Sequence, residues 1–224
     1  MANPSSKAPA QRLTLITLVV LALIIVGVIV YFQVAQPQSQ ASTVSTDITL
    51  TDQPVLGAED APVEIAVFED FKCPSCKHFD EEIYPQVQRE LVDTGKARIY
   101  FLNFPFIGPD STTAALAGEC VYNQNNDAFW KYKTFVFRSQ GPESQEWATP
   151  AALADIARAN VPEIDADAMQ SCTEQATYSD QVNADKAMGN GAGVSGTPTV
   201  YVNGQKLASF DFASIEQAVN GASN

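Results

Sequence analysis

Residues 63–79 read VEIAVFEDFKCPSCKHF, and this stretch decides the fold. Its first part, 63–68, consists mostly of β-favouring residues and predicts a buried strand. From Pro74 onward an apolar residue recurs at every fourth position, as on one face of a helix, at Phe79, Ile83, Val87 and Leu91. Gly95 follows where such a helix should end. The two cysteines of this stretch therefore lie at the junction of a strand and a helix.

Outward from this stretch, the pattern of an α/β domain continues. Residues 98–104, RIYFLNF, predict a second strand, so that strand, helix and strand form a βαβ unit. We also expect a short strand at 48–51. Residues 111–188 are helical in character, and a strand pattern returns only at 199–202, before a VNG turn and a closing helix over 214–219. A helical block thus interrupts the α/β domain.

The four residues Cys73-Pro74-Ser75-Cys76 have the spacing of a redox-active pair. At the start of a helix, free backbone N–H groups and the positive end of the helix dipole stabilise a thiolate on the first cysteine. Cys73 is therefore the predicted nucleophile of thiol-disulfide exchange, and Cys76, one turn later, is the resolving thiol. Pro74 fits the first helical turn without losing a hydrogen bond, and Ser75 is small enough for a partner sulfur to approach. Neither residue sets the redox direction.

Other uses of a Cys-x-x-Cys motif compete with exchange. A c-type haem site needs histidine directly after the second cysteine, where Lys77 stands. A zinc site needs a second pair of ligands, whereas Cys120 and Cys172 are far apart and His78 is the only histidine, so we expect no metal. An inert structural disulfide is the remaining alternative, which the strand-to-helix position disfavours. No cofactor is expected beyond the redox disulfide itself.

Three titratable residues flank the pair. Glu69 and Asp70 lie just before it and could take a proton from Cys76 or raise the pKa of its thiol, although acidic residues at the end of a strand are usually just solvated. His78 lies about 200° around a regular helix from Cys76. It is therefore expected to point away from both thiols and to be exposed.

An unbroken run of 20 uncharged residues, 13–32, precedes the domain and is long enough as a helix to cross a bilayer core of about 30 Å. A cleaved signal peptide is the competing interpretation, but its apolar region would be about 7–15 residues long and would end in an A-x-A-like site, which 33–37 matches poorly. Lys7 and Arg12 place the segment 1–12 in the cytoplasm. We therefore predict a single-pass signal-anchor, with the domain outside the cytoplasmic membrane.

Composition describes the remaining chain. Residues 33–45 are rich in Gln, Ser and Ala, as in a flexible linker. Beyond the apolar run, 11 basic and 26 acidic side chains give a formal charge of −15. So acidic a domain repels polyanions, and nucleic acid is not an expected partner.

Cys120 and Cys172 stand alone in the predicted helical block. Cys120 shares a helical face with Leu116, and Cys172 shares one with Met169, so both thiols should point into the block. Because disulfides persist outside the cytoplasm, we expect a structural disulfide between them. Closing so long a loop would contribute roughly 4 kcal/mol. Two buried, unreactive thiols are the alternative.

Two stretches of this sequence resemble the signatures of the DsbA-like thiol-disulfide oxidoreductases. They are AEDAPVEIAVFEDFKCPSCKHF at 58–79 and GVSGTPTVYVNG at 193–204, and the similarity spans about 55–220. The resemblance implies a thioredoxin-like α/β fold with an inserted helical subdomain. It also implies that Thr197-Pro198 is the family's cis-proline dipeptide, packed against the active-site disulfide, with the Thr197 backbone pairing to an extended substrate segment.

On this basis the domain 46–224 divides into a thioredoxin part, 46–108 and 190–224, and a helical insertion, 109–189. The sequence departs from the family at one position of the site. Relatives commonly carry a buried Glu six residues before the first active cysteine, where this sequence has Val67. Glu69 shares a face with Val67 only if the strand continues regularly to that point.

We predict an extracytoplasmic thiol-disulfide oxidoreductase that oxidises exported proteins. The resemblance motivates this direction, as does a compartment in which substrate thiols arrive reduced. Re-oxidation would then fall to a quinone-linked membrane partner. Two alternatives stay open: a reductase or isomerase that uses the same residues, and a tethered binding or chaperone module in which the cysteine pair is a staple. Only the last predicts that Cys73→Ser leaves activity intact.

Overall fold

The computed structural model describes residues 48–222. The expected cytoplasmic segment 1–12, the anchor 13–32 and the linker 33–45 therefore lie outside the described residues. Within 48–222, no helix is both long and apolar enough to cross a membrane.

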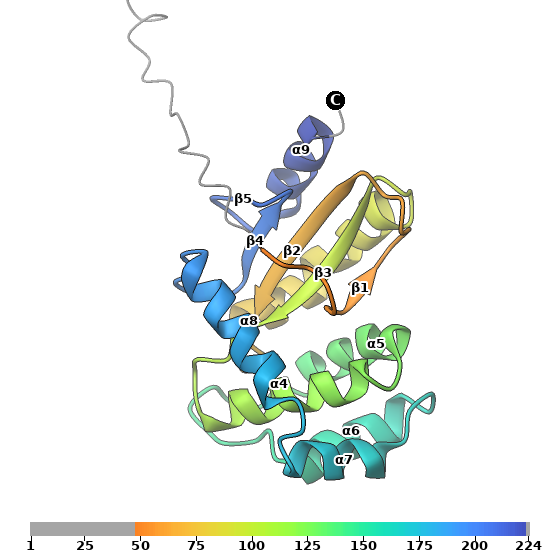
Figure 1. Ribbon diagram of the computed structural model, residues 1–224, viewed down its shortest axis with the longest axis vertical. Helices are drawn as coiled ribbons and strands as arrows, with labels where there is room; N and C mark the ends of the chain where they lie inside the picture. The colour runs from red at the N-terminus through yellow and green to blue at the C-terminus, as the bar shows by residue number, and fades with distance from the viewer. Residues whose placement is uncertain (1–47, 223–224) are drawn as a thin grey trace, which may run out of the picture. The chain divides into compact units, whose positions relative to one another are not determined.

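A mixed sheet with the strand order β1-β3-β2-β4-β5 forms the centre of the domain (Figure 1). Its strands are β1 Val55–Leu56, β2 Val63–Glu69, β3 Ala97–Asn103, β4 Thr199–Val202 and β5 Gln205–Lys206. β2 and β3 run parallel and a helix joins them, so the predicted βαβ unit is confirmed. β4 pairs antiparallel with β2, and the predicted VNG turn leads to β5, with Asn203 and Gly204 both at positive φ. The second signature stretch therefore lies beside the first.

The expected strand at 48–51 is wrong, because the first strand is β1, further along the chain. Ile48 and Leu50 instead pack as half-buried side chains against one face of the sheet. Asp52, at φ 60°, then turns the chain toward β1. Alternating apolar side chains arise equally from a strand and from an extended segment that crosses a sheet, which is why the pattern misled.

The helix after the cysteine pair runs from Pro74 to Val92 and alternates between α-helical and π-helical turns. Its parts are α2 Pro74–His78, η1 Phe79–Ile83, α3 Tyr84–Val87 and η2 Gln88–Val92. Pro85 lies inside it, and a regular α-helix is disrupted there because proline has no N–H to donate and its ring clashes with the preceding turn. The four-residue apolar repeat still packs against the core, and Gly95, at φ 73°, ends the helix as predicted.

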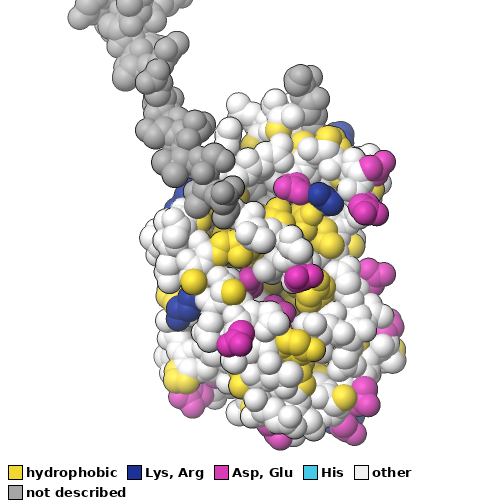
Figure 2. Space-filling model, viewed as in Figure 1, with side chains coloured by type: hydrophobic (Ala, Val, Ile, Leu, Met, Phe, Trp, Pro, Cys, Tyr) yellow, Lys and Arg dark blue, Asp and Glu magenta, His cyan; other side chains and the backbone are white. Residues whose placement is uncertain are grey.

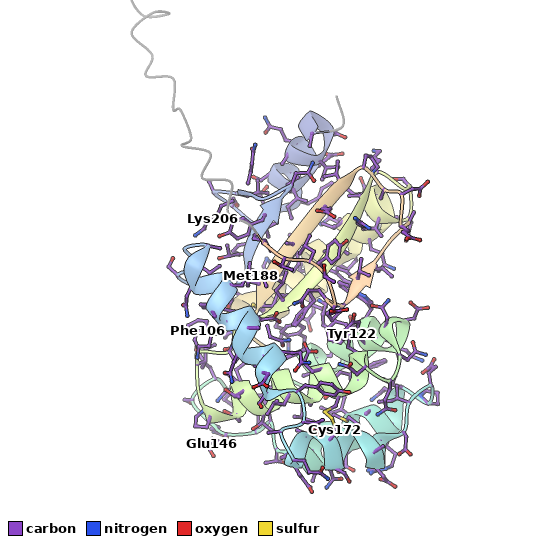
Figure 3. The ribbon with its side chains drawn as sticks, viewed as in Figure 1. Phe106, Tyr122, Glu146, Cys172, Met188 and Lys206 are labelled. Carbon is purple, nitrogen blue, oxygen red and sulfur yellow. A yellow bond between two sulfur atoms is a disulfide. The ribbon has the colours of Figure 1, made fainter. Side chains whose placement is uncertain are left out.

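A block of helices lies between β3 and β4. Its members are α4 Pro109–Tyr122, α5 Asn126–Arg138, α6 Pro150–Asn160, α7 Ala166–Glu174 and α8 Ser179–Gly191, and α9 Phe212–Ala222 follows β5. Asn125, Thr149 and Asp165 cap α5, α6 and α7 with side-chain oxygens that accept backbone N–H groups. Helices α4 to α7 gather at one end of the sheet (Figure 1). A disulfide between Cys120 of α4 and Cys172 of α7 joins two of them (Figure 3).

Different helices cover the two faces of the sheet. On one face, Val63, Ile65 and Val67 of β2 pack toward α9 and the helix after the cysteine pair. On the other face, Ala66 and Phe68 belong to a cluster that the end of α8 covers. Figure 1 shows α8 crossing in front of the sheet. The cysteine pair thus lies where β2 passes into the covering helix of the first face.

The chain is acidic, and on the face that Figure 2 shows its acidic side chains do not gather in one patch. Figure 2 shows Asp and Glu side chains scattered over one face of the domain. Among the large apolar side chains of 48–222, only Phe106 is markedly exposed, at 48%. The others are buried or half-buried, and α5 contributes Phe129, Tyr132 and Phe137 to the core.

Candidate active site

The two cysteines of the motif occupy the turn between β2 and α2. Cys73 is the N-cap residue of the helix, and its N–H donates to the Asp70 carbonyl oxygen at 2.9 Å. Its own carbonyl oxygen accepts the N–H groups of Cys76 and Lys77. Pro74 begins the helix, where its missing N–H removes no hydrogen bond. Cys73 is 7% exposed, whereas Cys76 is fully enclosed.

The Cys73 sulfur lies in surroundings that favour its thiolate. A hydrogen bond with the Cys76 side chain lowers the pKa of Cys73 from 9.0 to about 6, against the opposing effect of burial. The Thr197 side chain and the backbone N–H groups of Cys76 and Ser75 also lower this pKa. The Thr197 hydroxyl finds no other partner among the described residues, so it is available to donate to this sulfur. At neutral pH the Cys73 thiol is therefore mostly ionised.

Cys76 has the opposite character. Burial raises the pKa of its thiol well above the ordinary value, and the hydrogen bond to Cys73 and the charge of Glu69 raise it further. One thiol is thus ionised near the surface, and the other is protonated and enclosed. This asymmetry suits a nucleophile and its resolving partner in thiol-disulfide exchange.

The loop before β4 meets the cysteine pair. Its Thr197-Pro198 peptide bond is cis, as the resemblance implies. In its protonated form Cys73 donates from Sγ to the Thr197 carbonyl oxygen, which lies 3.2 Å away, so this loop is beside the nucleophile. Pro74 and Ser75 are exposed next to that sulfur. The accessible surface of the site is therefore formed by the turn and the loop together.

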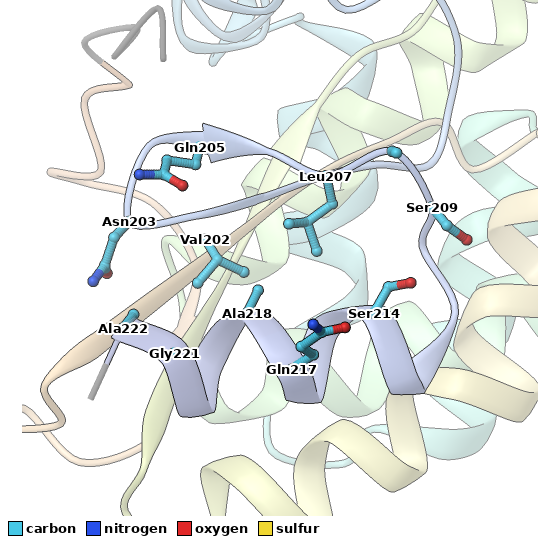
Figure 4. Close-up of a pocket in the computed structure, with 11 residues that line it drawn as sticks. Val202, Asn203, Gln205, Leu207, Ser209, Ser214, Gln217, Ala218, Gly221 and Ala222 are labelled. Carbon is cyan, nitrogen blue, oxygen red and sulfur yellow. The ribbon is translucent and has the colours of Figure 1, made fainter. Parts of the chain in front are cut away.

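A groove continues from this loop. A cavity of about 250 Å³ is lined by Pro198, Leu207 and Phe210, among others. A larger cavity of about 630 Å³ lies between the β4–β5 hairpin and α9, as Figure 4 shows. Leu207, Ala208 and Ser209 line both, so the two cavities are neighbours, and together they are called the groove here. An extended chain that reaches the cysteine pair could lie along this groove.

Glu69 and Asp70 are both buried, so the expectation that they are solvated is wrong. β2 continues regularly through Glu69, which therefore lies on the same face as Val67, under the helix that carries Cys76. Burial raises the pKa of Glu69 to about 7, although the charge of Lys133 lowers it. An acidic group therefore lies beneath the thiols, two residues later than in the family pattern.

Lys133 of α5 is the partner that allows Glu69 to be buried. Its Nζ lies 3.4 Å from Glu69 Oε1 and 2.6 Å from Asp80 Oδ1, and all three side chains are enclosed. Burial opposes the Lys133 charge, but Asp80 and Glu69 raise its pKa above the ordinary value, so it stays protonated. The Tyr84 ring, with its centroid 4.5 Å from the Nζ, also favours the cation. A triad of one base and two acids thus lies under the redox pair.

Lys133 and Asp80 were not predicted from the sequence. Lys133 stands four residues from both Phe129 and Phe137, which are buried, so helical spacing alone puts it on the apolar face of α5. Asp80 likewise stands four residues before the buried Tyr84. A charge on an apolar face requires a buried partner, and that is the signal by which both could have been found.

Asp70 ties the active-site turn to the loop after β3. Its Oδ1 accepts the Lys72 N–H at 2.8 Å, and its Oδ2 accepts the N–H groups of Phe106 and Ile107. Both oxygens are therefore engaged by backbone donors. This arrangement suits holding the turn in place better than moving a proton.

The remaining residues of interest lie apart from the thiols. His78 is exposed, as expected from its position on the helix. Cys120 and Cys172 are joined to each other, with their Cα atoms 6.0 Å apart. Within the described part of the chain, no group of three or more His, Cys, Asp or Glu side chains is arranged to hold a metal ion.

The chain is similar to known proteins along most of its length. The family model described as Thioredoxin matches residues 49–221. The "Probable disulfide bond formation protein D" of Bacillus anthracis is 36% identical over 198 residues, which are 88% of this chain and 89% of that protein. The crystal structure of oxidised BdbD from Bacillus subtilis is 35% identical, covers 78% of this chain and 95% of that one, and has a TM-score of 0.74. For the crystal structure of Chlamydia trachomatis DsbA, identity is 27%, coverage 78% and 93%, and the TM-score 0.71.

Proposed function

The chain belongs to the DsbA-like family of thiol-disulfide oxidoreductases, and we propose that it is a dithiol oxidase that introduces disulfides into exported proteins through Cys73 and Cys76. The observation that carries this direction is the stabilised Cys73 thiolate. A disulfide whose reduced form is stabilised is a strong oxidant of other dithiols. The name of the Bacillus anthracis relative, a probable disulfide bond formation protein, agrees with this direction.

The reaction would start from a Cys73–Cys76 disulfide. A substrate thiolate attacks the Cys73 Sγ, the Cys73–Cys76 bond breaks, and Cys76 leaves as a thiolate that takes up a proton. A second substrate thiolate then attacks the substrate sulfur of the mixed disulfide and releases Cys73 as a thiolate. The substrate gains one disulfide and loses two electrons. The Cys73/Cys76 pair takes up these electrons and becomes a dithiol. Release of Cys73 is favourable because a low-pKa thiolate is a good leaving group.

Glu69 is suited to exchange the proton of Cys76. With a pKa of about 7, its carboxyl and carboxylate forms interchange near neutral pH. Its charge raises the pKa of Cys76, so the two groups lie within electrostatic reach. We assign to it the donation of a proton when Cys76 leaves and the acceptance of that proton when Cys76 attacks during re-oxidation. Lys133 and Asp80 remain as a paired cation and anion in either state.

The loop at Thr197 and the groove beyond it are suited to hold the substrate. An extended segment that pairs with the Thr197 backbone would bring its own sulfur close to Cys73, because the Thr197 carbonyl oxygen is already 3.2 Å from that Sγ. The groove offers Leu207 and Phe210 to apolar side chains, and Thr199 and Ser209 to polar ones. A reduced, unfolded exported chain has both kinds of group exposed.

We further propose that residues 13–32 anchor the domain outside the cytoplasmic membrane and that a quinone-linked membrane partner re-oxidises it. The uncharged run and the basic residues before it support the anchor. Fractionation tests it: the intact chain should stay with membranes in high salt. Release by salt, or a shortened mature N-terminus, would contradict the anchor.

The reduction potential of the Cys73/Cys76 couple tests the proposed direction. The soluble domain would be equilibrated in glutathione buffers and its thiols trapped and counted. A value near about −120 mV is expected for an oxidase, whereas one near about −270 mV would favour a reductase. A couple that fails to exchange with glutathione would favour the structural staple instead.

A further inference from the structure

The loop between α5 and α6, residues 139–149, lies against the active-site turn and has no part in the mechanism above. Its most direct contact is made by Gln140, whose Nε2 donates to the Phe71 carbonyl oxygen at 2.8 Å and to the Cys73 carbonyl oxygen at 3.1 Å. Gln140 is half-buried. A side chain of the helical insertion therefore donates a hydrogen bond to the backbone of the nucleophile itself.

The Cys73 carbonyl group, which Gln140 contacts, also accepts the first backbone hydrogen bonds of the helix that begins at Pro74. The Cys73 carbonyl oxygen accepts the N–H groups of Cys76 and Lys77, and the turn that these bonds close directs the backbone N–H groups of Ser75 and Cys76 toward the Cys73 sulfur. A third donor on the same oxygen limits rotation of the peptide group between Cys73 and Pro74. The position of Gln140 thus bears on the geometry around the reacting sulfur.

A buried ion pair holds the loop in place. Lys72, next to the nucleophile in sequence, is 3% exposed, and its Nζ donates to Asp110 Oδ1 at 2.6 Å and to the Gln145 carbonyl oxygen at 3.0 Å. Asp110 Oδ2 accepts the N–H groups of Trp147 and Ala148. The turn, the start of α4 and the loop are therefore bound together through two side chains.

We propose that the loop 139–149 is a positioning element of the redox site, in which Gln140 sets the geometry of the turn around the Cys73 sulfur and the Lys72–Asp110 pair holds the loop against it. The proposal rests on the assignment of Cys73 as the exchanging thiol. It gives the helical insertion a part in tuning the couple, since the loop belongs to that insertion and touches the turn directly. Gln140 is a positioning residue because it contacts the backbone and not the reacting atoms.

The test uses Gln140→Glu and Gln140→Ala in the full chain. Glutamate keeps the size of glutamine but puts an acceptor and a negative charge against two carbonyl oxygens, so it should turn the contact into a repulsion next to Cys73. We expect the equilibrium constant for oxidation of glutathione by the couple to fall about tenfold, which is about 30 mV for two electrons. The Cys73 pKa, read from the ultraviolet absorbance of its thiolate, should rise. Gln140→Ala should shift both quantities in the same direction by less.

Ser144→Asp is the matched control. Ser144 is exposed in the same loop, so this variant adds the same charge without touching the turn, and neither quantity should change. The proposal would be overturned if both Gln140 variants melted at lower temperature but kept the wild-type Cys73 pKa and equilibrium constant. A purely structural contact would alter only stability. Failure of the oxidase assignment would appear separately, as a low potential of the wild type, since the proposal concerns the ratio of variant to wild type.

Discussion

The two cysteine pairs of this domain occupy opposite surroundings. Cys73 and Cys76 lie three residues apart at the start of a helix, where backbone N–H groups reach the first sulfur and Glu69 lies beneath the second. Cys120 and Cys172 lie 52 residues apart, in the last turns of α4 and α7, and are joined to each other by a disulfide. The last turn of a helix has free carbonyl oxygens but offers no free N–H groups to a thiolate. Position within a helix therefore separates an exchanging pair from a structural one.

The charged neighbours deepen this contrast. A thiol pair that alternates between dithiol and disulfide releases and takes up protons, and a buried group of suitable pKa is needed to exchange them. Glu69 provides such a group, and Lys133 provides the positive charge that makes its burial tolerable. A permanent disulfide needs neither. The interior under Cys76 is polar for a reason that the interior around Cys120 does not share.

Of the variants that separate the two cysteine pairs, Cys73→Ser should have the largest effect on activity. Without the nucleophile no mixed disulfide can form at this position, so turnover should fall by on the order of 1,000-fold or more, toward the uncatalysed rate. The measurement is the appearance of a disulfide in a reduced peptide with two cysteines. The double variant Cys120→Ala/Cys172→Ala should keep its rate within about twofold at a temperature where it is folded. Activity that survives Cys73→Ser would instead support a binding or chaperone module.

The same double variant should be much less stable than the wild type. Loss of a cross-link over 52 residues should lower the free energy of unfolding by roughly 4 kcal/mol on the chain-entropy estimate. Urea unfolding followed by circular dichroism measures this loss. Replacing Cys73 and Cys76 by Ser should cost about half as much on the same estimate, because their cross-link closes a much shorter loop. A loss below about 1 kcal/mol in the double variant would mean that packing, not the cross-link, holds α4 to α7.

Local patterns were sufficient to predict the parts of this molecule that depend on neighbouring residues. The strands at 63–69 and 97–103, the helix between them and the turn at Asn203 follow from periodicity and turn chemistry within a few residues. The reactive pair follows from its spacing and its place before a helix. Even the failure at 48–51 is local, because Ile48 and Leu50 are half-buried against the sheet, as alternate side chains of a strand would be, without the backbone pairing of a strand.

Among contacts between distant segments, the Cys120–Cys172 disulfide was expected from the cysteines and the place of Thr197 beside the redox pair from the family resemblance, but the polar contacts were not predicted. Glu69 is followed 64 residues later by Lys133, and only the packing of α5 against the redox helix brings them together. An acidic residue at the end of a strand is expected to be solvated unless a buried partner is known. The burial of Glu69 was therefore not predicted. The same holds for Gln140, whose hydrogen bonds to the turn span 67 and 69 residues. Polar groups on apolar faces mark where such contacts exist but not with whom.

Alkylation of the reduced protein compares the reactivity of single thiols from the two pairs. With a pKa of about 6, Cys73 is about 90% thiolate at pH 7, against about 1% for a thiol at the ordinary 9.0, so its rate with iodoacetamide should be higher by up to about 100-fold. The rate should fall as the pH drops through about 6, where Cys73 takes up its proton. Cys172, freed by Cys120→Ala, should react slowly over the same range. A Cys73 profile centred near pH 9 would remove the basis for the oxidase assignment.

Glu69→Gln should have the smallest effect on the rate of exchange. It tests where the Cys76 proton goes rather than which sulfur reacts. In the reaction of the reduced protein with oxidised glutathione, Cys73 first forms the mixed disulfide, and Cys76 then displaces glutathione while it gives up its proton. If Glu69 accepts that proton as a carboxylate, the second step should quicken about tenfold between pH 6 and 8, because the carboxylate fraction rises from about 9% to about 91% around a pKa of 7. Quenched-flow trapping of the mixed disulfide measures this step.

In Glu69→Gln the inflection near pH 7 should disappear, while Lys133 keeps Asp80 as its partner and the core stays paired. Glu82→Gln, on the exposed side of the same helix, should retain the wild-type profile, because its carboxylate faces solvent. An inflection near pH 7 that persists in Glu69→Gln would show that the Cys76 proton leaves by another route. The buried triad would then serve only to place a charge under the thiols, and the two cysteine pairs would differ in the ionisation of one sulfur alone.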